Sequence, residues 1–300
     1  MVGLALSLRE VVLPSLGSHA GRVREGTAPG GDATFAIDAR AEEHLEAWVA
    51  EHAPGVAFFS EDRGLVGEGE QVLIVDPIDG TRPAMAGFES ACVSVAIAGG
   101  MPDPRMRDVE AAAIVEIKSG DRFVARRGGG VTATVPLRLS ANEDVERMFW
   151  VYGLRGRPSR MVVEVLAELL DASSTWGAAF DLGSATYDTT RILTGQLDAY
   201  VEPSPRIVAE VPGAREAFER VGRGGILNNT PYDLAAAVLC LVEGGAIVTD
   251  ARGEPLDDRP LLGSGEAHQM SCVAAANEAL HQQLLAAVDQ GIRRLTETPG

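Results

Sequence analysis

The chain has 300 residues, of which 46% are hydrophobic and 23% are charged, and its formal net charge is −17 at pH 7. This length and balance indicate a globular protein with one large domain or two packed lobes. The acidic charge disfavours nucleic acid and anionic lipid as partners, because both are negatively charged. No apolar stretch approaches the length of a membrane span, so we expect no membrane association.

The first half of the chain alternates predicted helices with short β-strands. A helix is predicted at residues 40–52, where Ala41, Leu45 and Trp48 recur on one face. A Gly/Pro-rich segment at 26–32 precedes it and is typical of a loop. The other predicted elements of this half are a helix at 4–13 and β-structure at 56–60, 72–75, 92–98, 111–117, 122–125 and 131–139.

A lobe boundary is predicted around residues 136–142. It separates an α+β lobe, residues 1–139, from an α/β lobe, residues 140–300. The predicted elements of the second lobe are strands at 148–152, 199–201, 246–249 and 271–275 and helices at 159–170, 184–193, 213–221, 232–243 and 277–296.

The cysteines and the N-terminus both favour a cytoplasmic location. Cys92, Cys240 and Cys272 lie far apart in apolar stretches with no CxxC pair, so we expect buried, reduced thiols. The first 14 residues lack the basic start and continuous apolar run of a signal peptide.

Residues 72–81, VLIVDPIDGT, place two acids at the end of an apolar strand. Asp76 ends the apolar run, Pro77 prevents simple continuation, and Asp79 follows three residues after Asp76. Gly80 permits a tight backbone approach, and Thr81 can begin a helical turn whose N–H groups stay free. Carboxylates beside such N–H groups suit a phosphate bridged to hard cations, although the segment alone is more typical of an Asx-rich turn.

Acids end or begin elements at three other places. Glu61 follows the strand that contains Phe58 and Phe59, Asp233 begins a largely apolar helix, and Asp38 lies at the start of the amphipathic helix. Each acid alone is more typical of a solvated turn or a helix N-cap.

Together, and in this order, these segments resemble the inositol monophosphatase superfamily, which includes fructose-1,6-bisphosphatases and 3′-phosphonucleotide phosphatases. Residues 76–81 match its first signature, and 232–245 look like its second, with Tyr232 where tryptophan is usual. Residues 183–185 and 195–200 look like its central helix and strand. The resemblance implies a layered αβαβα sandwich with the active site between two lobes.

The resemblance also implies two or three Mg²⁺ ions, with Mn²⁺ as an alternative. One ion would be held by Glu61, Asp76 and the Ile78 carbonyl. A second would be held by Asp76, Asp79 and Asp233. Such oxygen-only ligand sets suit Mg²⁺ or Mn²⁺ better than Zn²⁺.

By the same resemblance, the reaction is hydrolysis of a phosphate monoester by a metal-activated water, without a covalent phosphoenzyme. Thr81 and Asp38 would form a hydrogen-bonded pair that helps take the proton of this water, with Glu61 assisting. The implied substrate contacts are Gly80, Thr81, Arg82, Gly183 and Ser184.

Two departures from the family pattern concern the substrate. Arg82-Pro83 stands where Asn-Phe or Glu-Phe is usual, and Arg82 is either a substrate contact or a surface cation. Residues 203–229 form an insertion before the Asp233 helix. This insertion either sets specificity or is a surface excursion or dimer contact.

The expected partner is a small phosphorylated sugar or cyclitol. Fructose-1,6-bisphosphate and 3′-phosphoadenosine 5′-phosphate are alternative substrates. The alternative of another class is a non-catalytic, metal-binding regulatory protein, which the presence of all the expected ligands disfavours. A homodimer is expected because most members of the family are dimers or larger assemblies.

Overall fold

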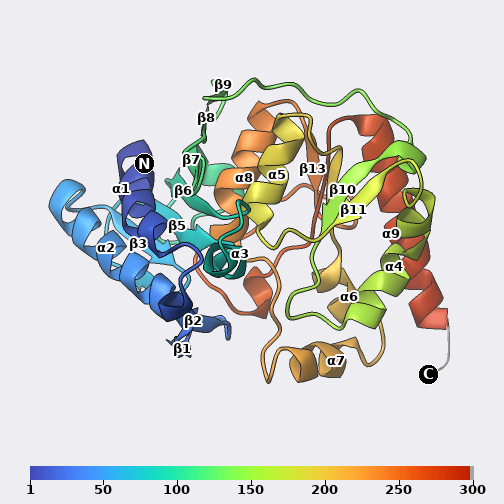
Figure 1. The fold of residues 1–300 in the computed structure, drawn as a ribbon, viewed down its shortest axis with the longest axis horizontal. Helices are drawn as coiled ribbons and strands as arrows, with labels where there is room; N and C mark the ends of the chain where they lie inside the picture. Colours follow the sequence, from blue (N-terminus) through green and yellow to red (C-terminus); the bar gives the residue numbers. More distant parts are fainter. Residues whose placement is uncertain (298–300) are drawn as a thin grey trace.

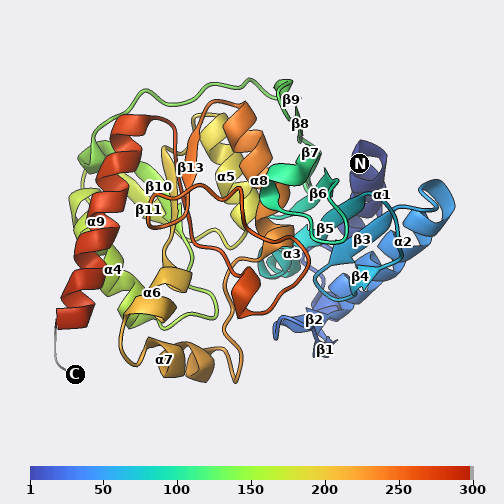
Figure 2. The ribbon, with the colours of Figure 1, turned by 180° about the vertical axis from the view of Figure 1, so that it is seen from behind.

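The structure is a computed structural model that describes residues 1–297. Residues 298–300 of the predicted second lobe lie outside the described part of the chain. The elements form five layers (Figures 1 and 2). Helices α1 (Val2–Val12) and α2 (Ala36–His52) cover a seven-stranded sheet, α5 (Ala185–Leu193) and α8 (Pro231–Glu243) lie between this sheet and a five-stranded sheet, and α4 (Ser159–Ala172) and α9 (Glu278–Glu297) form the last layer. The predicted αβαβα order is therefore confirmed.

The seven-stranded sheet has the order β4-β3-β5-β6-β7-β8-β9. β3 and β5 are parallel, and the other neighbours are antiparallel. All eight residues of β5 are buried, because helices cover both faces of this central strand. The strands are β3 (Ala57–Ser60), β4 (Gly64–Val66), β5 (Val72–Asp79), β6 (Cys92–Ala98), β7 (Val109–Glu116), β8 (Arg122–Arg126) and β9 (Gly130–Ala133).

The five-stranded sheet has the order β11-β10-β12-β14-β13. Its strands are β10 (Phe149–Tyr152), β11 (Ala178–Phe180), β12 (Ala199–Glu202), β13 (Ile247–Thr249) and β14 (Cys272–Ala275). An apolar core that includes Ile74 and Leu239 joins the two sheets through the middle helices. The predicted lobe boundary at 139/140 stays a prediction. Helix α8 belongs to the second half of the sequence, yet it packs on β6 and β7 of the first sheet.

The β-structure predicted at 131–139 is wrong beyond Ala133. Residues 134–144 run without regular structure from β9 to the second sheet (Figure 1). Pro136 lacks an N–H donor, and the Arg138 N–H bonds the Leu193 carbonyl at the end of α5 rather than a neighbouring strand.

Several short elements were not predicted. The segment expected to be a loop contributes to a two-stranded hairpin, and the insertion contains a helix before the predicted one. These elements are β1 (Arg24–Thr27), β2 (Ala33–Phe35) and α6 (Ser204–Glu210). The helical turn expected at Thr81 is α3 (Thr81–Ala86), and the predicted helix of the insertion is α7 (Ala214–Val221). Between residues 1 and 297, no helix combines the length and apolar character needed to cross a membrane.

Candidate active site

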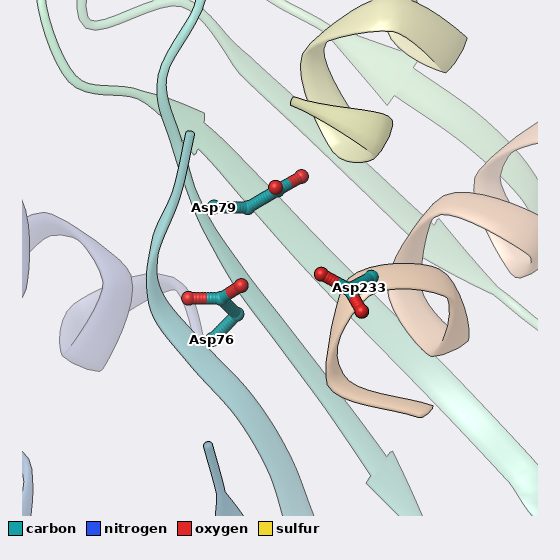
Figure 3. A group of neighbouring side chains, drawn as sticks. All are labelled: Asp76, Asp79 and Asp233. Carbon is teal, nitrogen blue, oxygen red and sulfur yellow. The ribbon is translucent and has the colours of Figure 1, made fainter. Parts of the chain in front are cut away.

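Three aspartates lie together where β5 ends and α8 begins. One carboxylate oxygen of each of Asp76, Asp79 and Asp233 lies within 4.8 Å of the others, and their side chains face one another (Figure 3). Residues three apart in a regular strand point to opposite faces of the sheet. The β5–β6 pairing is irregular between Asp76 and Asp79, so both carboxylates can reach the same point.

Asp233 forms hydrogen bonds at the N-terminus of α8. It is the third residue of α8, and its Oδ2 accepts hydrogen bonds from the Thr230 N–H at 2.6 Å and the Thr230 hydroxyl at 2.8 Å. This is a capping box, so Asp233 takes part in capping α8, and its role as a metal ligand stays a prediction. The cap fixes the side chain beside β5.

The aspartates repel one another in this buried site. Burial and then the charges of Asp79 and Glu61 raise the pKa of Asp76 well above its usual range. Burial and then the charge of Asp79 raise the pKa of Asp233 to about 7. Burial also raises the pKa of Asp79, against hydrogen bonds from the Thr186 N–H and the Ser184 hydroxyl. A hard divalent cation would relieve this repulsion, and the donor set consists of carboxylate oxygens.

The cluster forms one end of a pocket. The pocket and the solvent space at its mouth together measure about 880 Å³. Asp38 is the one predicted site residue that does not line it in the described part of the chain. The predicted residues that line it are Glu61, Asp76, Ile78, Asp79, Gly80, Thr81, Arg82, Gly183, Ser184 and Asp233.

Glu61 follows β3 and lies outside the three-aspartate group, although it lines the same pocket. Burial, followed by the charges of Asp32 and Asp233, raises its pKa well above the usual range. The turn that carries Glu61 is held by Glu42 of α2. The Glu42 carboxylate accepts the Ser60 hydroxyl at 2.7 Å and the Asp62 N–H at 3.2 Å.

Thr81 and Asp38 lie within hydrogen-bond distance, as the sequence predicted. The Thr81 hydroxyl lies 3.0 Å from Asp38 Oδ1 and 3.2 Å from the Ile78 carbonyl oxygen. The second Asp38 oxygen accepts the Phe35 N–H at the start of α2. Burial raises the pKa of Asp38 to about 7 despite these hydrogen bonds.

Backbone geometry explains the glycine after Asp79. Gly80 has φ 91°, and a Cβ there would lie 2.5 Å from the Ser90 carbonyl oxygen. Two of the predicted substrate contacts, Gly183 and Ser184, lie on the loop before α5. Gly183 packs on Pro83. Ser184 caps the helix, and its hydroxyl donates to Asp79 at 2.9 Å. The loop is therefore tied directly to the acidic cluster.

Arg82 is neither free nor a simple surface cation. Its guanidinium lies 3.1 Å from Asp32 Oδ1 and 5.5 Å from the centre of the Phe35 ring. Arg155, from the loop after β10, pairs with the other Asp32 oxygen. Although burial opposes ionisation, Arg155 and Arg82 lower the pKa of Asp32 to about 2. The two arginines thus meet at one carboxylate beside the pocket.

The far end of the pocket holds a buried ion pair. Arg157 Nη2 lies 2.7 Å from Glu202 Oε2, with side-chain exposures of 7% and 0%. Asn229 donates to the Tyr200 hydroxyl at 2.5 Å and accepts from Arg157 at 3.4 Å. These buried groups are paired with one another, so they fix the shape of this part of the pocket lining.

Sequence reasoning did not single out several of these residues. Glu42 follows Asp38 by four positions and therefore lies on the same face of the helix. The spacing of these two acids could have pointed to Glu42 as a residue near the site. The arginines of the 153–157 loop and Glu202 carried no local pattern, because they reach the site only through the packing of the two sheets. The pocket-lining acids and bases in this group are Asp32, Arg155, Arg157, Asp181, Asp188 and Glu202.

Comparison with known proteins agrees with this geometry. The sequence profile of the inositol monophosphatase family matches residues 2–293. An inositol-1-monophosphatase of Mesorhizobium japonicum is 27% identical over 267 residues, which cover 86% of this chain and 83% of that protein. A fructose-1,6-bisphosphatase/inositol-1-monophosphatase of Methanothermobacter thermautotrophicus is 26% identical, with 95% and 93% covered. The solved structure of the extragenic suppressor protein suhB of Bartonella henselae has the same fold, with a TM-score of 0.72, 22% identity and 97% of both chains covered.

Proposed function

Because the chain belongs to the inositol monophosphatase family, whose members are phosphatases, we propose that it removes the phosphate of a small cyclitol or sugar monophosphate with the help of Mg²⁺. The observation that carries the proposal is the cluster of Asp76, Asp79 and Asp233, which lies in the lining of a pocket. The presence of all the expected carboxylates disfavours the alternative of a non-catalytic regulatory protein.

The cluster suits Mg²⁺ for two reasons. Its donors are carboxylate oxygens, which hard cations prefer, and burial together with the neighbouring carboxylate charges raises the pKa values of Asp76 and Asp233, a repulsion that a cation would relieve. Asp76, Asp79 and Asp233 would hold one ion, and Glu61, Asp76 and the Ile78 carbonyl a second. When bound, Mg²⁺ supplies a Lewis acid that activates water and stabilises the leaving oxygen.

The chain's own residues move the proton. The Thr81 hydroxyl is hydrogen-bonded to Asp38, so Thr81 can take a proton from the attacking water as it passes its own to the carboxylate. Glu61 would assist as a second acceptor at the pocket wall. The backbone N–H groups of Gly80 and Thr81 would hold phosphate oxygens beside the cluster.

The rest of the pocket supports a polyol as the leaving group. Asn228 and Ser264 line it with partly exposed polar side chains that can bind hydroxyl groups. Tyr200 and Tyr232 are the aromatic residues lining the pocket in the described part of the chain, and both are buried. This lining offers little exposed ring surface for stacking an adenine, which disfavours the nucleotide alternative.

A second candidate substrate is fructose-1,6-bisphosphate. Arg82 and Arg155 flank the pocket and share a single carboxylate, Asp32, so the group keeps a net positive charge. Such a group suits a second phosphate. The cyclitol or sugar monophosphate remains the first choice because Asp32 already occupies both guanidinium groups.

The experiment is a phosphate-release assay with purified protein, with Mg²⁺ and with EDTA, across inositol 1-phosphate, glucose 1-phosphate, fructose-1,6-bisphosphate and 3′-phosphoadenosine 5′-phosphate. We expect Mg²⁺-dependent release that is fastest with a cyclitol or sugar monophosphate. A preference for the bisphosphate would favour the second candidate, and no release from any substrate with Mg²⁺ or Mn²⁺ would refute the proposed function.

Two further expectations belong to this proposal. Cys92, Cys240 and Cys272 are buried and unpaired, which supports a reducing compartment such as the cytoplasm. Assembly as a homodimer rests on the family alone. Light scattering of the purified protein would test it by giving a mass near twice 31.5 kDa.

A further inference from the structure

Three segments from distant parts of the sequence meet beside the pocket. They are the loop before β2, the loop after β10 and the last part of the insertion, which lines the pocket with Ile226, Leu227, Asn228 and Asn229. Leu227 contacts both other loops. A Cβ placed on Gly156 would lie 2.9 Å from Leu227 Cβ, and one placed on Gly31 would lie 3.8 Å from Leu227 Cδ2.

Both glycines lie beside Leu227, and Gly156 leaves space that the Leu227 side chain occupies. Gly31 has φ 93° and Gly156 has φ 72°, a backbone conformation that favours glycine. At Gly156, a side chain would also collide with Leu227, since 2.9 Å is closer than carbon atoms pack. The Leu227 side chain therefore lies between one glycine from each half of the sequence.

An ion pair lies next to this contact. Gly31 precedes Asp32 and Gly156 follows Arg155, and these two charged residues pair with each other. Leu227 and the Asp32–Arg155 pair thus make one continuous wall of the pocket, part apolar and part charged.

The insertion holds Leu227 in place. Gln269 donates to the Ile226 carbonyl at 2.5 Å and accepts from the Asn228 side chain at 2.9 Å, so hydrogen bonds fix both neighbours of Leu227. Farther back, Ile207 of α6 and Phe218 of α7 are fully buried and anchor the insertion in the core of the second sheet. The insertion is therefore a built part of the wall rather than a loose excursion.

We infer that Leu227 determines specificity, because its side chain closes the pocket between Gly31 and Gly156 and restricts the leaving group to a single sugar or cyclitol ring. The inference rests on the proposed function, since it concerns which phosphate esters enter the same site. A larger leaving group, such as a nucleoside, would have to occupy the volume that Leu227 fills. Removing the side chain should admit such esters without touching the acidic cluster.

The test compares two probes, inositol 1-phosphate and adenosine 3′-monophosphate, in the full-length protein with saturating Mg²⁺. For Leu227→Ala we expect the ratio of kcat/KM for the nucleotide to kcat/KM for the cyclitol to rise about tenfold or more, the scale on which pocket volume discriminates substrates. Leu227→Met keeps the bulk and should keep the ratio. Val221→Ala removes an exposed apolar side chain of the same insertion and is the matched control.

The outcomes separate the two claims. If the wild type hydrolyses inositol 1-phosphate and Leu227→Ala leaves the ratio unchanged, the inference about Leu227 is wrong and the proposed function stands. A ratio that rises equally in Val221→Ala would also overturn it, since the effect would then follow loosening of the insertion. If the wild type releases phosphate from neither probe nor from any other phosphate ester, the proposed function fails, and this inference fails with it.

Discussion

The protein without metal should lose stability as the pH rises from 6 to 8. Asp38, Glu42 and Asp233 each have a pKa raised by burial to about 7 in the folded protein, whereas carboxyl groups in the unfolded chain titrate near 4. Between these values the folded state binds more protons than the unfolded state. Stability therefore falls as the pH rises through this window and levels off above about 7.

The size of the effect follows from the pKa values. A carboxyl group with a folded pKa of about 7 loses about 1.4 kcal/mol of stabilisation between pH 6 and pH 8, so the three groups together lose about 4 kcal/mol. Burial lowers the pKa of His281, which acts in the opposite sense by at most about 0.8 kcal/mol over the same range. From these four groups the net expected loss is about 3 kcal/mol. Asp76 and Glu61, whose pKa values burial also raises, add to the loss, and the Met1 amino group, whose pKa burial lowers, opposes it.

Urea unfolding in EDTA at pH 6, 7 and 8 measures this loss of stability. The same series with Mg²⁺ in place of EDTA measures how much the bound cation stabilises the protein at each pH. Bound cation favours the ionised carboxylates, so Mg²⁺ should stabilise the protein more at pH 8 than at pH 6. At a pH where the Mg²⁺ concentration is 100 times Kd, the total stabilisation is about 2.7 kcal/mol. Stability in EDTA that is constant or rises from pH 6 to pH 8 would refute the reasoning about these buried acids.

Two mutational predictions concern residues that the sequence did not reveal. Glu42→Ala should lower the free energy of unfolding by about 1–3 kcal/mol, because it leaves the buried Ser60 hydroxyl unpaired. It should also weaken Mg²⁺ binding in a thermal-shift titration, because Glu42 holds the turn that carries Glu61. Glu43→Gln, on the exposed side of α2, should change neither quantity. Arg157→Met should lower the free energy of unfolding in urea by about 3–5 kcal/mol, because it leaves the buried Glu202 unpaired. Adding Glu202→Gln should recover part of that loss. If the losses of the two single variants simply add in the double variant, the ion pair is contradicted.

Patterns within short segments predicted much of the fold. The apolar run of β5 and the helical spacing of α2 and α8 follow from local periodicity, and each is present. The β-structure predicted near Pro136 failed because a connection between two sheets can be as apolar as a strand. Helix α6 was missed because Pro203 and Pro205 suggested a loop, although proline is well tolerated in the first turn of a helix.

The candidate site likewise contains residues that local patterns predicted and residues that only long-range packing brings to the site. Asp76 and Asp79 share one signature, so their proximity could be predicted from the sequence. Asp233 joins them because α8 packs between the sheets, which only the family resemblance anticipated. Arg155 and Glu202 depend on long-range packing and carry no local signal, so the sequence alone could not place them beside the cluster.

The most direct measurement of the central claim is the rate of Mg²⁺-dependent phosphate release from inositol 1-phosphate by the wild type and by Asp79→Asn and Asp233→Asn. Asp257→Asn, an exposed change far from the cluster in sequence, is the control. We predict that both cluster variants remain folded and lose kcat by orders of magnitude, because each loses a carboxylate that would hold the cation. Near-normal activity with Mg²⁺ in either cluster variant would contradict the account.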